Sequence, residues 1–143
     1  DWTGVEKNVD MLSFFKTLIA FRKAHPVLRR SDFYTAHNAS GYPELSFHGT
    51  RAWNLDVSNP FLAFAFMYAE PKADFGTEKD SFIYCAVNSY WGDLDFELPV
   101  VPSGMQWRIV AYTADSGAAG NVCSEGRVWV CQRSIMLLIA TAS

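Results

Sequence analysis

The first strong pattern along the chain is a helical repeat of apolar positions in the segment 8–30. Large side chains recur there at spacings of three and four residues, which places them on one face of a helix; they are Met11, Leu12, Phe15, Leu18, Ile19 and Arg22. Phe14 and Phe21 widen this face, so it needs a large partner surface. Asn8 is expected to cap the first turn. Pro26 is expected to end the helix, because its ring disfavours helical backbone in the preceding residue.

After the helix the pattern changes to short apolar or alternating runs separated by turn residues, which is typical of strands. The predicted strands are residues 44–48, 61–69, 81–90, 94–98, 106–113, 127–131 and 134–140. The run 61–69 is apolar on both sides and predicts a central strand antiparallel to 81–90, whereas 44–48 predicts an edge strand. The fold class is therefore mainly β: an antiparallel β-sandwich preceded by one amphipathic α-helix.

Within these strands, Leu94, Phe96 and Leu98 alternate with acidic residues and are expected to face inward. The intervening segments 1–7, 70–80 and 114–126 are expected to be loops or polar connections, and a short turn is expected around 132–133.

Composition and charge exclude several function classes. A length of 143 residues fits one domain, or one domain with a remnant of another. The net charge of −3 argues against nucleic acid as a partner, and no apolar run is long enough to predict a membrane partner. The three cysteines have no metal-ligand spacing and do not resemble a disulfide framework, which favours a reduced, cytoplasmic compartment. No glycine-rich phosphate loop predicts a cofactor, and no metal site is expected.

Candidate catalytic groups are few. A glycosidase needs two carboxyl groups about 5 Å or more apart, and Asp93, Asp95 and Glu97 share a strand face at such a spacing. Alternate acids on an exposed strand face usually serve solubility, so no catalytic residue is predicted. The histidines lie in predicted loops without a partner spacing, and His25 is expected to pack or cap; they are His25, His37 and His48.

The tryptophans are the remaining functional signal, because an indole ring can stack on the apolar face of a sugar or fill a core. Trp107 and Trp129 lie in predicted strands and are expected to be core residues. Trp53 and Trp91 lie in predicted loops and are the better candidates for binding a sugar substrate, and Trp2 is a third candidate.

Several segments together resemble a known family. They are Asp1–Trp2, the helix with Leu18, Ile19, Phe21 and Arg22, the run HPVLRR at 25–30, the run YPELSFHG at 42–49, Trp53, the strand 84–88, Trp107 and Arg133–Ser134. With these residues the chain resembles the C-terminal region of isoamylase-type glycogen debranching enzymes, in glycoside hydrolase family 13 of the α-amylase superfamily. Phe47 stands where that family usually has tryptophan.

The resemblance implies a division into two parts. Residues 1–32 would be the end of a (β/α)₈ barrel with its last helix, and residues 33–143 a C-terminal β-sandwich domain. The family's catalytic aspartate, glutamate and second aspartate lie upstream, so none is carried over and this chain alone is expected to be inactive.

The resemblance also implies a role for the β-domain. The whole enzyme would hydrolyse α-1,6 branch linkages of glycogen or related α-glucans, and the domain would pack on and stabilise the barrel of the same polypeptide. The alternative is a carbohydrate-binding module that contacts α-glucan through loop aromatics. An exposed helix face would also allow self-association.

Overall fold

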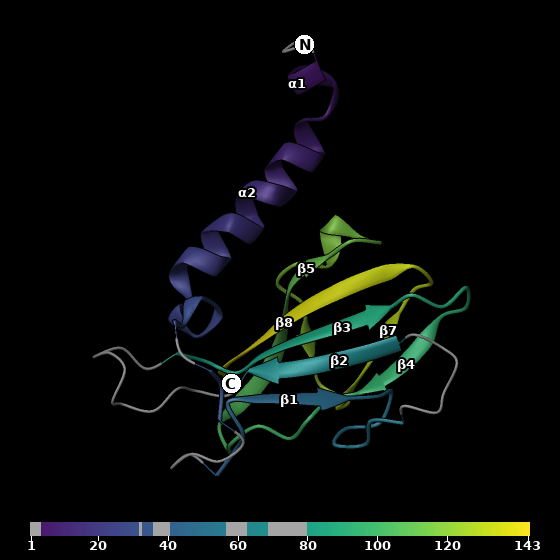
Figure 1. The fold of residues 1–143 in the computed structure, drawn as a ribbon. Coiled ribbons are helices and arrows are strands. Elements are labelled where there is room, and N and C mark those ends of the chain that lie inside the picture. Colours follow the sequence, from purple (N-terminus) through teal and green to yellow (C-terminus); the bar gives the residue numbers. More distant parts are fainter. Residues whose placement is uncertain (1–3, 32, 36–40, 57–62, 69–79) are drawn as a thin grey trace.

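The computed structural model describes residues 4–31, 33–35, 41–56, 63–68 and 80–143. In this part of the chain the helix α2 (Val9–Ala24) precedes a set of antiparallel strands (Figure 1). The predicted helix end is confirmed. His25 has extended backbone at φ −113° and ψ 95°, and its N–H closes the last turn on the carbonyl of Phe21 at 3.1 Å. A short 3₁₀ helix, η1 (Pro26–Arg29), follows.

The start of the helix differs from expectation. A single helical turn, α1 (Gly4–Lys7), occupies most of the segment predicted as a loop. Asn8 joins α1 to α2, and its side-chain Nδ2 donates to the carbonyl of Gly4 at 2.8 Å. The predicted cap is therefore wrong, because the side chain closes the preceding turn and makes no capping hydrogen bond to α2.

The strands form two sheets, and every strand pair within them is antiparallel. The six-stranded sheet has the order β1 (Leu45–His48), β2 (Ala63–Tyr68), β3 (Ile83–Asn88), β8 (Ser134–Ala142), β5 (Met105–Tyr112) and β6 (Val122–Cys123). The second sheet pairs β4 (Leu94–Glu97) with β7 (Arg127–Val130). The predicted edge position of β1 and the antiparallel pairing of β2 with β3 are confirmed.

Two features of the strands were not predicted. The segment 114–126 contains a 3₁₀ helix, η3 (Ser116–Ala118), and the two-residue strand β6, in addition to loop. The turn after β7 carries the chain from the small sheet to the large one, so the last two strands are not neighbours in one sheet. The predicted connection 70–80 lies outside the described residues except for Asp80.

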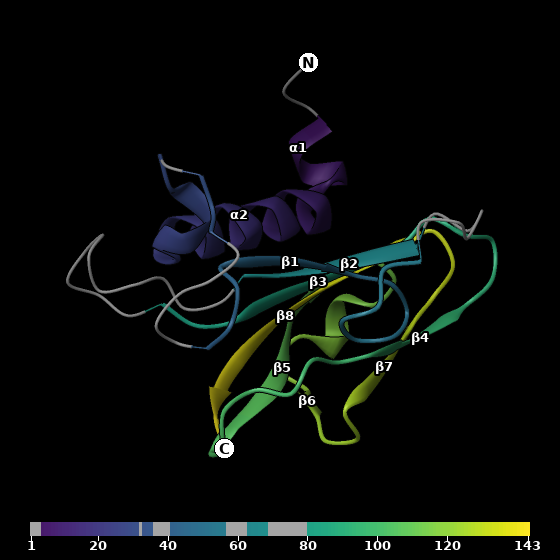
Figure 2. The ribbon, with the colours of Figure 1, turned by 60° about the horizontal axis from the view of Figure 1, so that its bottom comes forward.

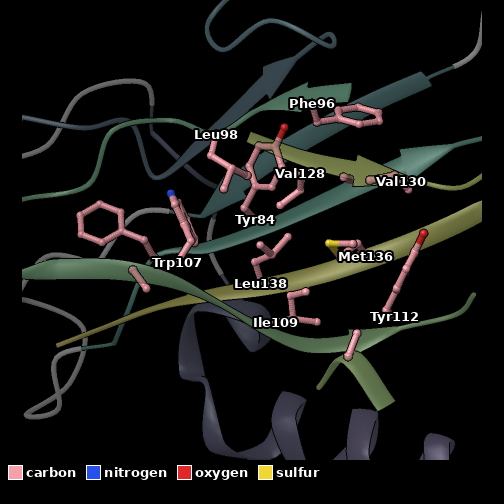
Figure 3. Close-up of a cluster of buried hydrophobic side chains, with 14 residues drawn as sticks. Tyr84, Phe96, Leu98, Trp107, Ile109, Tyr112, Val128, Val130, Met136 and Leu138 are labelled. Carbon is pink, nitrogen blue, oxygen red and sulfur yellow. The ribbon is translucent and has the colours of Figure 1, made fainter. Parts of the chain in front are cut away.

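The core lies between the two sheets, which confirms the predicted β-sandwich. Figure 3 shows its side chains between β4 and β7 on one side and the large sheet on the other. Of the residues predicted to face inward, Phe96 and Leu98 are buried and Leu94 is half-buried. Trp107 is also buried, and its indole N–H donates to the carbonyl of Pro99 at 2.8 Å.

Trp129 contradicts its predicted core position, because its side chain is 68% exposed. The reason is the alternation of β7, in which neighbouring side chains point to opposite faces. Val128 and Val130 occupy the inner face and are buried, so Trp129 must point outward.

The helix α2 lies on the side of the large sheet away from β4 and β7 (Figure 2). No residue of α2 is buried. Phe14 and Phe21 are half-buried, whereas Phe15 is 55% exposed. The apolar face predicted from the sequence therefore points largely to solvent; its exposed members are Met11, Leu12, Phe15 and Ile19.

Buried polar groups join the helix to the sheets. The Asp80 carboxylate lies 2.5 Å from Nδ1 of His25 and accepts the N–H of Val27 at 2.9 Å and of Ser81 at 2.8 Å. The His25 ring also packs on Phe21, with centroids 4.2 Å apart, in agreement with its predicted packing role. These contacts hold the backbone that follows α2 against the start of β3, and Val27 and Asp80 are both buried there.

A second buried side chain connects the two sheets. Asn88, at the end of β3, donates from Nδ2 to the carbonyls of Val130 at 2.9 Å, Cys131 at 3.1 Å and Gly92 at 2.9 Å. Its Oδ1 accepts the N–H of Tyr90 at 2.9 Å. One amide therefore holds the end of β7 and the turn before β4 against the large sheet.

We expect Asn88→Ala to lower the free energy of unfolding by about 2–3 kcal/mol, because it leaves buried carbonyls and an N–H without partners. Urea unfolding followed by circular dichroism measures this. Ser89→Ala, at the exposed neighbouring position, is the matched control and should change stability by less than about 0.5 kcal/mol. Equal unfolding midpoints for Asn88→Ala and the native chain would contradict the role given to this amide.

Candidate functional site

The three acids considered for catalysis each hold a neighbouring group. Asp93 accepts the backbone N–H of Gln132 at 2.9 Å. Asp95 forms an ion pair with Arg127, and Glu97 accepts the N–H of Ala52 at 3.3 Å. These contacts fasten β4 to β7 and to the loop after β1, so the acids have structural roles and the geometry adds no support for catalysis by them.

The described residues offer neither a metal-ligand cluster nor a reactive thiol at Cys85. No group of three or more His, Cys, Asp or Glu side chains gathers there to hold a metal ion. The three cysteines are free, and burial raises the pKa of the Cys85 thiol to about 11, which keeps it protonated at neutral pH. The part of the chain covered by the structure contains no helix long and apolar enough to cross a membrane.

The predicted sugar-binding tryptophans lie in different settings. Trp2 lies outside the described residues. Trp91 is 69% exposed in the turn between β3 and β4, and its ring packs on that of Tyr90 with centroids 4.9 Å apart. Trp53 is 49% exposed in the loop after β1. Both of these rings are accessible, and within the described residues no contact joins Trp53 to Trp91.

Trp53 lies at the tip of a tight hairpin. The N–H of Gly49 donates to the carbonyl of Asn54 at 2.8 Å, and the N–H of Asn54 donates to the backbone carbonyl of Arg51 at 3.3 Å. A Cβ at position 49 would lie 2.7 Å from the Asn54 carbonyl oxygen, so only glycine allows this approach. Trp53 itself has a φ of 62°, in the left-handed region that large L-residues avoid.

A buried histidine holds Trp53 in this conformation. Nδ1 of His48 accepts the N–H of Trp53 at 2.8 Å, so Nε2 carries the proton and donates to Oγ of Ser46 at 2.8 Å. Burial lowers the pKa of His48 to about 4, which keeps the ring neutral near pH 7. The two rings also meet edge to face, with centroids 4.8 Å apart. Only the neutral tautomer offers this acceptor to Trp53.

The hairpin is fastened to the small sheet as well. The N–H of Glu97 donates to the carbonyl of Thr50 at 2.8 Å, while the Glu97 carboxylate accepts the N–H of Ala52. Arg51 and Asn54, on the same hairpin, are exposed and carry hydrogen-bonding groups. The hairpin therefore presents a half-exposed indole with polar neighbours, an arrangement that can stack on an apolar ligand face and bind its hydroxyl groups.

Trp129 is an accessible ring, although its place in a predicted strand had favoured a core position. It stands on the outer face of the small sheet, opposite Asp95 in the register of β4 and β7. The sequence does contain a signal for this outward position. Val128 and Val130 are both apolar and share one face of the strand, so they can form the inner face, and Trp129 between them then points outward.

Comparison with known proteins gives the following matches, although no family model matches the sequence. An isoamylase from Pseudomonas amyloderamosa is 33% identical over 151 residues, which cover 97% of this chain and 18% of that enzyme. An isoamylase from Flavobacterium sp. is 30% identical over 154 residues, covering 97% of this chain and 20% of that enzyme.

A solved structure shares the fold. It is a pullulanase complexed with maltotetraose from Anoxybacillus sp. LM18-11, with a TM-score of 0.60 and 19% identity over 97% of this chain and 16% of the pullulanase. This chain spans about a fifth of the length of the isoamylases that it matches. Because those matches extend over nearly all of the chain, it belongs to the isoamylase family and is a fragment of such an enzyme.

Proposed function

We propose that this chain is the non-catalytic C-terminal β-domain of an isoamylase-type debranching enzyme, with the last helix of a (β/α)₈ barrel still attached. The domain packs on and stabilises the catalytic barrel of the same polypeptide. The whole enzyme hydrolyses α-1,6 branch linkages in glycogen or related α-glucans. The observation that carries this proposal is the apolar face of α2, which the described part of the chain leaves uncovered.

The exposure of this face is large. Met11 is 60% exposed, Phe15 is 55% exposed and Ile19 is 54% exposed, and all three lie within two and a half turns of one helix. Burial of such a side chain contributes about 1.5–3 kcal/mol. Contiguous exposed apolar side chains typically mark an interface. The matched isoamylases are about five times longer than this chain, so the remaining enzyme is a suitable occupant.

We expect Phe15→Glu to prevent self-association of the chain without lowering its thermal stability, because the Phe15 ring lies largely in solvent. Sedimentation velocity across a concentration series measures association. Ala20→Glu adds the same charge at another exposed position of α2 and should leave association unchanged. A large loss of stability in Phe15→Glu would show that the face is already packed within the chain, against the proposal.

The purified chain is expected to release no reducing ends from a branched α-glucan, because the candidate acids Asp93, Asp95 and Glu97 have structural roles. A reducing-sugar assay beside an active isoamylase tests this. Hydrolysis that persists after repurification, and that Glu97→Gln abolishes, would replace the proposal with a catalytic function.

A second function, binding of α-glucan through loop tryptophans, is favoured by the backbone of Trp53. A residue held at positive φ costs about 1–3 kcal/mol and persists where the surrounding structure enforces it, often at ligand sites. His48 supplies that enforcement and leaves the indole half exposed. Trp53 is the main candidate, Trp91 offers a more exposed ring on Tyr90, and Trp2 remains a prediction from the sequence.

We expect binding of α-glucan at Trp53 to weaken as the pH falls from about 6.5, the ordinary pKa of histidine, toward about 4, the pKa of His48 in the folded chain. The folded pKa lies below the unfolded one, so the unfolded chain gains a proton first, and stability of the hairpin is lost through this range. Tryptophan fluorescence during maltoheptaose titration at several pH values measures it. His48→Asn keeps an acceptor for Trp53 without titrating and should remove this dependence; an unchanged profile would contradict the role of His48.

A further inference from the structure

The outer face of the small sheet places an exposed ring beside fixed charges. Four side chains alternate outward with core residues along β4 and β7: Asp95, Glu97, Arg127 and Trp129. Trp129 is directly opposite Asp95, and Arg127 is directly opposite Glu97. Trp129 is as exposed as Trp91, at 68% against 69%, but it stands on paired strands rather than in a turn.

The charged groups beside Trp129 are held in place. Nε and Nη2 of Arg127 lie 2.6 and 2.5 Å from Oδ2 of Asp95. Glu97 Oε2 accepts the N–H of Ala52, and within the described residues Oε1 has no hydrogen-bond partner. The Arg127 guanidinium is half exposed, and in the described part of the chain Asp95 engages its Nε and Nη2 while Nη1 has no hydrogen-bond partner. A donor and an acceptor are therefore positioned next to the indole before any ligand arrives.

These groups select for one kind of ligand. Two carboxylates and one guanidinium give a negative excess, which disfavours phosphates and other anions. An apolar protein surface laid over them would remove three charges from water, at a cost of several kcal/mol for each ion that loses its hydration. An uncharged ligand with one apolar face and many hydroxyl groups avoids both penalties. A pyranose ring has that character, since its C–H face suits the indole and its hydroxyls suit the guanidinium and the carboxylate.

We propose that the outer face of β4 and β7 binds a chain of neutral sugars, with Trp129 as the stacking ring and Arg127 and Glu97 as hydrogen-bonding groups. The choice of an α-glucan as that chain rests on the proposed function. The hairpin that carries Trp53 is hydrogen-bonded to Glu97 of β4 through Thr50 and Ala52, so it adjoins this surface.

Titration of the ¹⁵N-labelled chain with maltoheptaose tests the proposal, because each of the five tryptophans gives one indole N–H signal. The signal absent from the spectrum of Trp129→Ala identifies Trp129. We expect that signal to shift saturably in the native chain. Trp129→Ala should weaken binding about tenfold, the loss expected when a stacking contact of about 1.4 kcal/mol disappears.

Two variants make the test specific. Arg127→Gln should weaken binding several-fold while leaving the Trp129 ring in place, and Phe33→Ala, which removes another ring that is largely exposed, should leave the affinity unchanged. Unchanged backbone spectra and thermal unfolding exclude loss of the fold as the cause.

Three outcomes would overturn the proposal: a Trp129 signal that does not move at saturating sugar, an equal loss of affinity in Phe33→Ala, or equal affinity for cellohexaose, a β-linked glucan. The first two remove the site and the third removes the α-glucan assignment. Packing of the domain on a barrel would survive each of them, because it depends on α2, whereas failure of the Phe15→Glu test would leave the sugar surface intact.

Discussion

The buried amide of Asn88 is the interaction on which the relation between the two sheets depends. Apolar contacts across the sandwich supply stability but no direction, because the hydrophobic effect depends on area alone. Hydrogen bonds from one amide to carbonyls of Val130, Cys131 and Gly92 do have direction. They allow one placement of β7 and of the turn before β4 relative to β3. A satisfied buried network of this kind specifies a single arrangement of a core.

That placement determines which aromatic rings reach solvent. Once Asn88 fixes the end of β7, alternation puts Val128 and Val130 in the core and Trp129 on the outer face. The Trp53 hairpin is aligned by a separate device, the neutral ring of His48, and by its bonds to β4. Trp129 is thus held by a regular strand and Trp53 by a buried polar side chain, and both devices orient a binding residue better than a free loop does.

The sequence predicted what depends on local pattern and missed what depends on tertiary contacts. Alternation located the strands, and Pro26 located the end of α2. Whether β7 and β8 share a sheet is invisible to alternation, because it depends on the path of the turn between them. Positive φ at Trp53 is likewise imposed by His48 from outside the hairpin. Trp129 was predicted in the core because it is a large aromatic residue. Alternation along a strand allows either Trp129 or the pair Val128 and Val130 to face the core, but not both.

The helix α2 also shows that local pattern predicts an element but not its tertiary contacts. Its periodicity predicted an apolar face, and the helix forms, yet Phe15 and Ile19 on that face remain more than half exposed. Beside Phe14, a cavity of about 210 Å³ lies between α2 and β5, lined on the helix by Asp10, Ser13, Phe14 and Thr17. The large sheet therefore receives a mixed polar side of the helix, while several of its largest apolar side chains face away. If α2 packed on this sandwich alone, the face with Phe15 and Ile19 would be expected to contact the large sheet. The proposed packing on a catalytic barrel of the same polypeptide would cover this second apolar surface of α2.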